Sequence, residues 1–533
     1  MLRKIFVLSL FFSIIQLLPS FSQTSYTTDD ADFWIAGENV DDNLGRDVVS
    51  GDLNGDGYDD LAVSASGASP NERTGAGIVY VFFGSHTFLN KNNVDLSIAE
   101  ADVKILGALA DDELGMSLGV GNIMNNGRKS LLIGAPYRSA SNGAVFVITF
   151  PSDFYGPQIL DLASPTGSQS IVTIIGNSGD YIGRAVGAGD MNGDGFDEIM
   201  IGGHYFFTNG VGYVVKNSGS YTNEQTINLS SSSNYHWKMT AAESLDLLGD
   251  SVLGADINGD SKADFIIGAA FAGSIAGNDS TGRVYVMFGT SSLPTGVTVG
   301  ANSATLIIRG RLDTSDSNPT SADYDNFGGA LASGDVNADG IKDLIIGASD
   351  DEIDRDGAEA IGMTYVVYGR ASFPSLINLS PAIKGGASPA DIAIIGATNV
   401  AGRIGDSVAS GRINLDSIDD ILTEAPSVGV NSEGRVFIIY GRYYFPPQFT
   451  VNLLNNEEDI VINGNIDNFS SVESITTGDA NNDGISEIYW GGPFLSQDIE
   501  SELSQDIRGW CGKAFIFQLM HLTNVKSNWD FYE

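Results

Sequence analysis

The 533-residue chain is poor in several residue types, and each shortage excludes a class of protein. It has one cysteine, Cys511, so no disulfide within the chain can stabilise the fold. Its 67 acids far outnumber its 27 lysines and arginines, and the formal charge of −40 disfavours binding to nucleic acid or anionic membranes. The four histidines, His86, His204, His236 and His521, are not paired at the spacing of zinc ligands.

Long apolar runs are also missing beyond the first residues of the chain. Arg3 and Lys4 precede an apolar stretch from Ile5 to Leu18. This order predicts a secretory signal peptide over residues 1–22, with the mature chain starting near Gln23. A membrane anchor is the alternative, although the stretch is short for a span of roughly 20 residues. We therefore expect a secreted or cell-surface protein, or a periplasmic one in a bacterium, with no membrane span after signal removal.

Glycine, by contrast, is abundant, with 65 residues, and much of it belongs to a repeat. A segment that begins Gly-Asp-Leu-Asn-Gly-Asp-Gly in its first copy recurs at intervals of 66 to 79 residues. Its seven copies start at Gly51, Gly121, Gly189, Ala255, Gly334, Gly411 and Gly478. Such even spacing over most of the chain is typical of a repeat architecture rather than of several unrelated domains.

Each copy has the same neighbours. An apolar residue and a glycine precede it, as in Leu44-Gly45, although the seventh copy has Phe469-Ser470. An apolar run ending in a Gly-Ala-Pro-like turn follows, as in Ile133 to Pro136, and then a β-branched and aromatic run such as Val79 to Phe83. With one further short strand, each unit has four strands and no amphipathic helix. Seven such units predict an all-β fold, a seven-bladed β-propeller of four-stranded antiparallel blades.

The two ends of the repeat region predict how the ring closes. Residues 32–37 resemble the outer strand of a blade, but no blade precedes them. The last repeat has its first three strands, ending at Phe517, and lacks a fourth. We therefore expect residues 32–37 to complete blade seven, which would remove an exposed sheet edge. The resulting domain map is a linker over 23–30, the propeller over 31–520 and a tail over 521–533.

The acidic loop of each repeat has the oxygen spacing of a calcium site. Side-chain oxygens recur at positions 1, 3, 5 and 9, position 7 offers its backbone carbonyl, and calcium requires six to eight such ligands. Five loops keep this set. Their residues are Asp52, Asn54, Asp56, Tyr58 and Asp60; Asp190, Asn192, Asp194, Phe196 and Glu198; Asp256, Asn258, Asp260, Lys262 and Asp264; Asp335, Asn337, Asp339, Ile341 and Asp343; and Asp479, Asn481, Asp483, Ile485 and Glu487.

Two alternatives to a calcium hairpin exist. An EF-hand requires a glutamate at position 12 and flanking helices, but position 12 is Val63 in the first loop and apolar or aromatic in the other four. The acids could also only cap tight turns, as Asp and Asn often do. The loops of repeats two and six have lost the set, and we expect the guanidinium of Arg412 to replace the cation in repeat six. The prediction is therefore about five Ca²⁺ ions per chain.

The apolar-glycine pair, the calcium hairpin and the Gly-Ala-Pro turn together resemble the FG-GAP repeat of integrin α subunits. The resemblance covers roughly residues 31–520. It implies a seven-bladed propeller with calcium hairpins on one face and partner-binding loops on the other. About a dozen residues follow the last blade here, whereas integrin α chains continue into further domains. An integrin β-like partner is therefore not implied.

Enzymatic signals are weak. Gly115 to Gly119 fits the G-x-S-x-G pattern of serine hydrolases, but that chemistry requires a strand–turn–helix elbow, and Ser117 lies in a first strand. FG-GAP repeats also occur beside a phospholipase that cleaves glycolipid anchors, although this chain has no room for a separate catalytic domain. The acidic stretch from Asp350 to Asp356 is interpreted as a solvated loop, with a cation or basic-partner site as the alternative. We expect a binding protein rather than an enzyme.

The expected recognition surface is the loop face opposite the hairpins, where loop lengths vary most. Its longest loops span about 310–326, 349–361 and 493–512, and its candidate aromatic contacts are Tyr137, Tyr205, Phe206, Tyr324 and Trp510. The predicted function is an integrin-α-like adhesion or ligand-binding module that takes a protein or glycan. The alternatives are a carbohydrate-binding or polysaccharide-cleaving propeller and a structural matrix protein. Asn228, Asn278 and Asn468 begin N-glycosylation sequons, which would make a glycoprotein only in a eukaryotic host.

Overall fold

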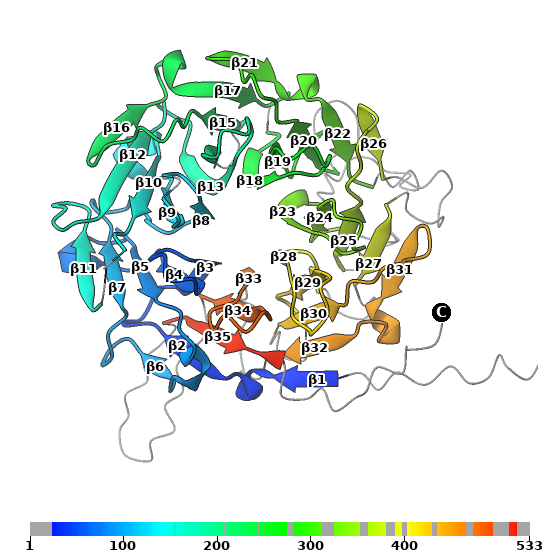
Figure 1. The fold of residues 1–533 in the computed structure, drawn as a ribbon, viewed down its shortest axis with the longest axis horizontal. Helices are drawn as coiled ribbons and strands as arrows, with labels where there is room; N and C mark the ends of the chain where they lie inside the picture. The colour runs from blue at the N-terminus through cyan, green and yellow to red at the C-terminus, as the bar shows by residue number, and fades with distance from the viewer. Residues whose placement is uncertain are drawn as a thin grey trace, which may run out of the picture.

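Seven β-sheets surround a central axis in the computed structural model (Figure 1), which confirms the predicted seven-bladed propeller. The innermost strand of every sheet lines the axis, and the outermost lies at the rim. The structure describes residues 24–519 except 125, 153, 155, 206–208, 243–244, 274–280, 312–324, 352–360, 380–389, 397–401, 429–433, 465–472 and 494–510. The predicted signal peptide, the C-terminal tail and most of the three long loops lie outside this part.

The three inner strands of each blade form an antiparallel meander. The first strands are β3 (Leu44–Gly51), β8 (Leu118–Gly121), β13 (Ile182–Gly189), β18 (Leu248–Ala255), β23 (Phe327–Gly334), β28 (Val408–Gly411) and β33 (Ser474–Gly478). The second strands are β4 (Asp60–Ala65), β9 (Ser130–Ala135), β14 (Glu198–Gly203), β19 (Asp264–Ala269), β24 (Asp343–Ala348), β29 (Asp420–Ala425) and β34 (Glu487–Gly492). The third strands are β5 (Ile78–Phe82), β10 (Ala144–Thr149), β15 (Val211–Val215), β20 (Arg283–Met287), β25 (Met363–Val367), β30 (Arg435–Ile439) and β35 (Lys513–Phe517).

The blades are five-stranded, so the prediction of four strands was one too few. The antiparallel fourth strands are β7 (Val103–Leu106), β12 (Ser170–Ile175), β17 (Tyr235–Thr240), β22 (Leu306–Arg309), β27 (Ile392–Ile395), β32 (Ile460–Asn463) and β2 (Phe33–Ala36). The fifth strands, each parallel to a fourth, are β11 (Gln158–Asp161), β16 (Gln225–Asn228), β21 (Val297–Gly300), β26 (Leu376–Asn378), β31 (Phe449–Asn452), β1 (Thr24–Thr27) and β6 (Val94–Asp95). Each fifth strand comes from the next repeat, so it links neighbouring blades.

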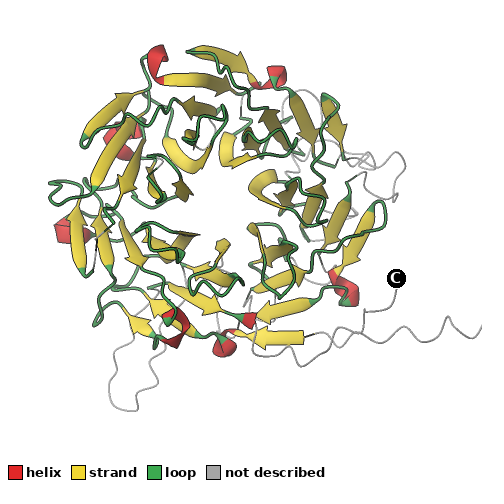
Figure 2. Cartoon of the chain, viewed as in Figure 1, coloured by secondary structure: helices red, strands yellow, loops and turns green. Residues whose placement is uncertain are grey.

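Helices contribute little to the fold (Figure 2). Among the residues that the structure describes, one four-residue α-helix and six single 3₁₀ turns lie in connections between strands. They are η1 (Thr28–Asp30), η2 (Pro70–Glu72), η3 (Phe88–Asn90), α1 (Arg138–Ser141), η4 (Ser232–Asn234), η5 (Ala301–Ser303) and η6 (Leu453–Asn455). In the described part of the chain, none of these is long and apolar enough to cross a membrane.

The N-terminal segment closes the ring with two strands. β2 pairs antiparallel with β35 and completes blade seven, as the sequence predicts. Residues 24–27, which were predicted as part of a linker, instead form β1 and pair in parallel with β32 of blade six. The Asp32 carboxylate also accepts the Gln518 backbone N–H at 2.6 Å. The segment therefore holds both of the last two blades.

The two glycines of the repeat meet across blade boundaries. The glycine of each described apolar-glycine pair has a positive φ, between 87° and 98°, which side chains disfavour. Its carbonyl oxygen lies against the Gly-Ala-Pro glycine of the preceding blade wherever that blade has one, whereas blades one and six have Ser64 and Glu424 at that position. A Cβ on Gly347, for example, would lie 2.0 Å from the carbonyl oxygen of Gly405. At the boundaries where two glycines meet, the close approach of neighbouring sheets leaves no room for a Cβ.

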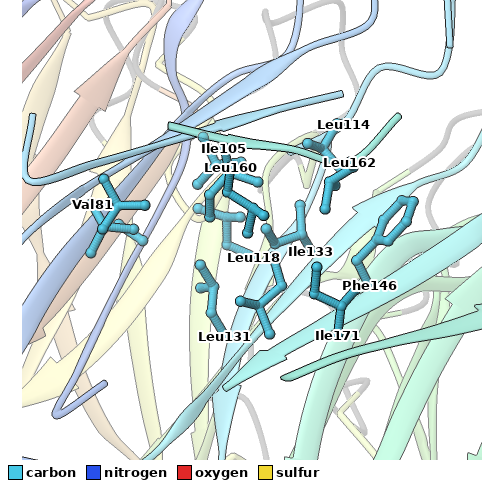
Figure 3. Close-up of a cluster of buried hydrophobic side chains, with 14 of the residues drawn as sticks. Val81, Ile105, Leu114, Leu118, Leu131, Ile133, Phe146, Leu160, Leu162 and Ile171 are labelled. Atoms are coloured by element: carbon cyan, nitrogen blue, oxygen red, sulfur yellow. The ribbon is translucent and has the colours of Figure 1, made fainter. Parts of the chain in front are cut away.

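Apolar side chains fill the space between sheets. Figure 3 shows the cluster between blades one and two, where Val81 and Ile105 of blade one face Leu131, Ile133 and other buried residues of blade two. The six other clusters likewise combine buried residues of consecutive blades, and the one that includes Phe33 and Ile516 joins blade seven to blade one. Because no blade buries its faces alone, stability depends on the closed ring.

Candidate functional site

The acidic loops all lie at one end of the blades. Each joins a first strand to a second, as residues 52–59 join β3 to β4. The antiparallel meander places the loops between strands two and three, and between strands four and one, at the opposite end. The hairpins and the predicted recognition loops are therefore on opposite faces of the disc.

The five intact loops share one hydrogen-bonded turn. In the first, both carboxylate oxygens of Asp52 accept backbone N–H groups, from Gly55 at 2.6 Å and from Gly57 at 3.0 Å. The Asp56 carboxylate accepts the Tyr58 N–H at 3.0 Å. Position 6 has a positive φ in every loop, including 66° at Ser261, a conformation that residues other than glycine seldom adopt. The chain thus turns its carboxylate and amide oxygens inward.

The acid at position 9 is buried in each of these loops. It begins the second strand, and one of its oxygens accepts the N–H of position 2, as Asp60 does from Leu53 at 2.8 Å. Burial, together with the negative charge of Asp56, raises the pKa of Asp60 to about 8. Burial likewise raises the pKa of Glu487 to about 8 and of Asp264 to about 7. Such carboxylates, surrounded by further acids, would be stabilised in their charged form by a cation.

Blade seven has the tightest acid group. Carboxylate oxygens of Asp479, Asp483 and Glu487 all lie within 4.8 Å of one another, the only such trio of potential metal ligands in the described residues. These oxygens suit a hard divalent cation such as Ca²⁺. The four other loops have the same turn, but their three acids do not come as close to one another.

Blades two and six depart from this pattern. The acid of position 9 is replaced in blade two by Ser130, whose hydroxyl lies 2.6 Å from that of Thr149. In blade six, Arg412 was expected to take the place of the cation. Its Nε instead lies 3.5 Å from Asp419, a residue outside the ligand set, and the side chain is 57% exposed. The exposed guanidinium therefore does not fill the centre of the hairpin as a cation would.

The central channel forms a polar cavity of about 730 Å³. At the end opposite the hairpins, each blade contributes one residue at the same position of the repeat, in the first strand or just before it. These seven residues, which we call the channel mouth, are Arg46, Met116, Arg184, Asp250, Gly329, Asp406 and Glu473. Arg46 contacts Glu473, and Arg184 lies 3.8 Å from Asp250. The sequence analysis did not identify this ring.

Three tyrosines lie together on loops of blades two and three. Tyr181 and Tyr205 stack with ring centroids 4.8 Å apart, and Tyr137 meets both edge-on. Two of the predicted aromatic contacts are thus brought together, whereas Phe206, Tyr324 and Trp510 lie outside the described residues. His204, next to Tyr205, lies 2.8 Å from Asp250 and is largely buried.

Other candidate residues have structural roles. The Ser117 hydroxyl donates to the Gly183 carbonyl of the next blade at 2.9 Å, which agrees with the reading that it is not a nucleophile. Asp351 is buried and accepts the Tyr365 hydroxyl at 2.5 Å, so the predicted solvated loop does not begin there. An aspartate two residues before the apolar-glycine pair is also buried in several blades, as Asp42 and Asp246 are, although the sequence analysis overlooked it.

Comparison with known proteins identifies the repeat. The chain folds as a seven-bladed β-propeller. The model of the FG-GAP repeat family matches its residues 44–82 and 248–287. This chain is therefore a propeller that carries FG-GAP repeats and resembles the integrin α propeller.

The relatives fall into two groups. This chain is 27% identical to phosphatidylinositol-glycan-specific phospholipase D of Bos taurus over 223 residues, which are 40% of this chain and 25% of that relative. It is 32% identical to integrin alpha-PS5 of Drosophila melanogaster over 173 residues, which are 31% of this chain and 15% of that relative. The match thus spans a quarter or less of each relative. A solved propeller titled "Structure of Dos1 propeller" aligns with 91% of this chain and 93% of its own, at 12% identity and a TM-score of 0.37.

Proposed function

We propose that the protein is a secreted, calcium-stabilised binding module for an extracellular protein or glycan. The observation that carries this proposal is the inward-turned oxygen set that recurs in five hairpins on one face, with three carboxylates within 4.8 Å in blade seven. Bound cations would offset part of the charge of −40 and stabilise blades that no disulfide links. The ligand would bind at the opposite face, as in an adhesion module.

The residues proposed to hold Ca²⁺ are the side chains at positions 1, 3, 5 and 9 and the carbonyl of position 7 in those five loops. When bound, the ion would supply charge that compensates the acids. The hydrogen bonds already present, such as those that Asp52 accepts, would keep the loop in its turned conformation.

Metal counting and calorimetry test this proposal. The purified protein should contain about five Ca²⁺ ions per chain, and chelation should lower its melting temperature. Asp479→Asn should remove one ion, whereas Asn126→Ala, at the same face in the hairpin of blade two, should leave the count unchanged. A chain without bound calcium, whose melting temperature does not respond to chelator, would contradict the proposal.

A carbohydrate-binding or polysaccharide-cleaving propeller is the second candidate. It is favoured by the arginines and acids that meet at the channel mouth beside three tyrosines, a combination that suits a sugar. Relatives named as phospholipases leave an enzymatic role open to test, but we propose binding because Ser117 and the hairpin acids have structural partners.

A further inference from the structure

We infer that the channel mouth and the adjacent tyrosines form a binding site for an acidic saccharide, a sugar with carboxylate or sulfate groups. This inference rests on the proposed function, because it assigns a ligand class and a place on the face opposite the hairpins. It depends on the charge of the mouth, on the position of the tyrosines and on the shape of the cavity.

Two arginines lie close together on one side of the mouth, each next to a carboxylate. Arg46, Met116 and Arg184 occupy the same repeat position on three successive blades. Burial lowers the pKa of Arg46 and the charge of Arg184 lowers it as well, whereas Asp47, Glu113 and Asp406 oppose this shift. The two guanidinium groups thus repel one another among acids, and an anion that contacted both would lessen that repulsion.

Arg184 has donors to spare. The shortest ion pair of its guanidinium, 3.8 Å to Asp250, is longer than a hydrogen bond. The guanidinium makes no hydrogen bond with the residues that the structure describes. Asp250 is already held by His204 at 2.8 Å. A guanidinium has five N–H donors in a planar fork that matches a carboxylate or sulfate. Arg184 is therefore the group that we expect to bind the anion.

The tyrosines lie beside this arginine. Tyr181 is three residues before Arg184, and its stacking partner Tyr205 is 42% exposed. Burial and the charge of Glu113 raise the pKa of Tyr137, and the positive charge of Arg184 opposes this shift. The Tyr137 hydroxyl is therefore close enough to Arg184 to interact with it electrostatically. Aromatic rings next to charged donors bind the apolar face of a sugar while its polar groups are hydrogen-bonded.

The cavity favours a saccharide over an extended acidic peptide. Its volume of about 730 Å³ is within the usual range of small-ligand pockets, and serine and threonine hydroxyls such as Ser251 and Thr476 line it. A ring-shaped polar opening offers no sheet edge along which a peptide strand could pair. Several hydroxyl groups of a sugar residue could find partners there.

Calorimetric titration of the full, calcium-loaded chain tests the inference. The probes are trigalacturonate, a sulfated heparin hexasaccharide, maltotriose as the neutral sugar and hexaglutamate as the acidic peptide. We expect one or both acidic saccharides to bind, weakening as salt rises, with maltotriose much weaker. Binding of one acidic sugar alone would identify carboxylate or sulfate as the anion.

Variants locate the site. Arg184→Gln should weaken binding about tenfold, and Tyr205→Leu, at an exposed ring that folding tolerates, about fivefold. Lys129→Gln and Tyr444→Leu, exposed residues near the hairpin face, should change nothing. Unchanged affinity in Arg184→Gln, equal binding of maltotriose, or binding of hexaglutamate alone would overturn the inference. A calcium-loaded chain that binds no probe would also overturn it while leaving the calcium module intact, because calcium content is measured in the same sample.

Discussion

The contact between glycines of neighbouring blades gives the most direct test of how this propeller is held together. The substitution is Gly347→Ala. A Cβ there would be 2.0 Å from the Gly405 carbonyl oxygen, against the roughly 3.2 Å that carbon and oxygen require. Blades five and six would have to part by about 1.2 Å. Because the obstacle is backbone rather than a movable side chain, we expect a loss of about 3 kcal/mol in the free energy of unfolding.

Urea unfolding at constant calcium, followed by tryptophan fluorescence, measures this loss. For an m-value of about 3 kcal/mol/M, the midpoint should fall by about 1 M. Gly268→Ala should behave alike, since its Cβ would be 1.9 Å from the Gly328 carbonyl oxygen. The matched control is Gly300→Ala in the rim strand β21, where a Cβ would meet nothing within 4 Å. If Gly347→Ala and Gly300→Ala unfolded at the same urea concentration, the glycine contact would not determine blade packing.

Three further predictions concern the hairpins and the strand β2 that closes the ring. Arg412→Asp combined with Leu415→Gly should complete the ligand set of blade six and raise the calcium count by one; an unchanged count would show that spacing alone does not make a site. Burial raises the pKa of Asp420 to about 8, so its neutral form stabilises the folded chain at low pH, and this contribution is lost between about pH 4 and 8. Wild type should therefore lose stability relative to Asp420→Asn as the pH rises through that range in urea titrations, and a difference that stays constant would contradict the raised pKa. Ile35→Ala, in the buried strand that closes blade seven, should cost about 3 kcal/mol by calorimetry, whereas a loss below 1 kcal/mol would mean that β2 adds little to closure.

The hairpins and the ring could be predicted from the sequence because both follow from short segments that recur. The turn around Gly57 is determined by residues within nine positions of one another, and seven copies of it set the number of blades. Closure by β2 was predictable as well, because one outer strand preceded the first repeat and another was missing after the last. These features depend on local patterns that repetition makes visible.

The fifth strands were not predicted, because they are short and some of their sequences have no strand pattern of their own. β6 contains only Val94 and Asp95, and β1 is the polar segment Thr24–Thr27. Each becomes a strand because the neighbouring blade offers an open edge, a tertiary cause that propensity does not report. The aspartate two residues before the apolar-glycine pair did carry a signal, since Asp42, Asp112, Asp180, Asp246 and Asp325 recur at that position.

The channel mouth required knowledge of the ring, but its residues share one repeat position. Arg46, Met116, Arg184, Asp250, Gly329 and Asp406 each follow the glycine of an apolar-glycine pair. In an open chain these residues would be some 70 positions apart and unrelated, whereas closure brings them around one opening. A position that changes its charge from copy to copy, inside a repeat whose flanking residues stay nearly constant, is not needed for packing. In a closed ring such a position faces the axis, where Arg184 has donors that its ion pair with Asp250 at 3.8 Å does not use.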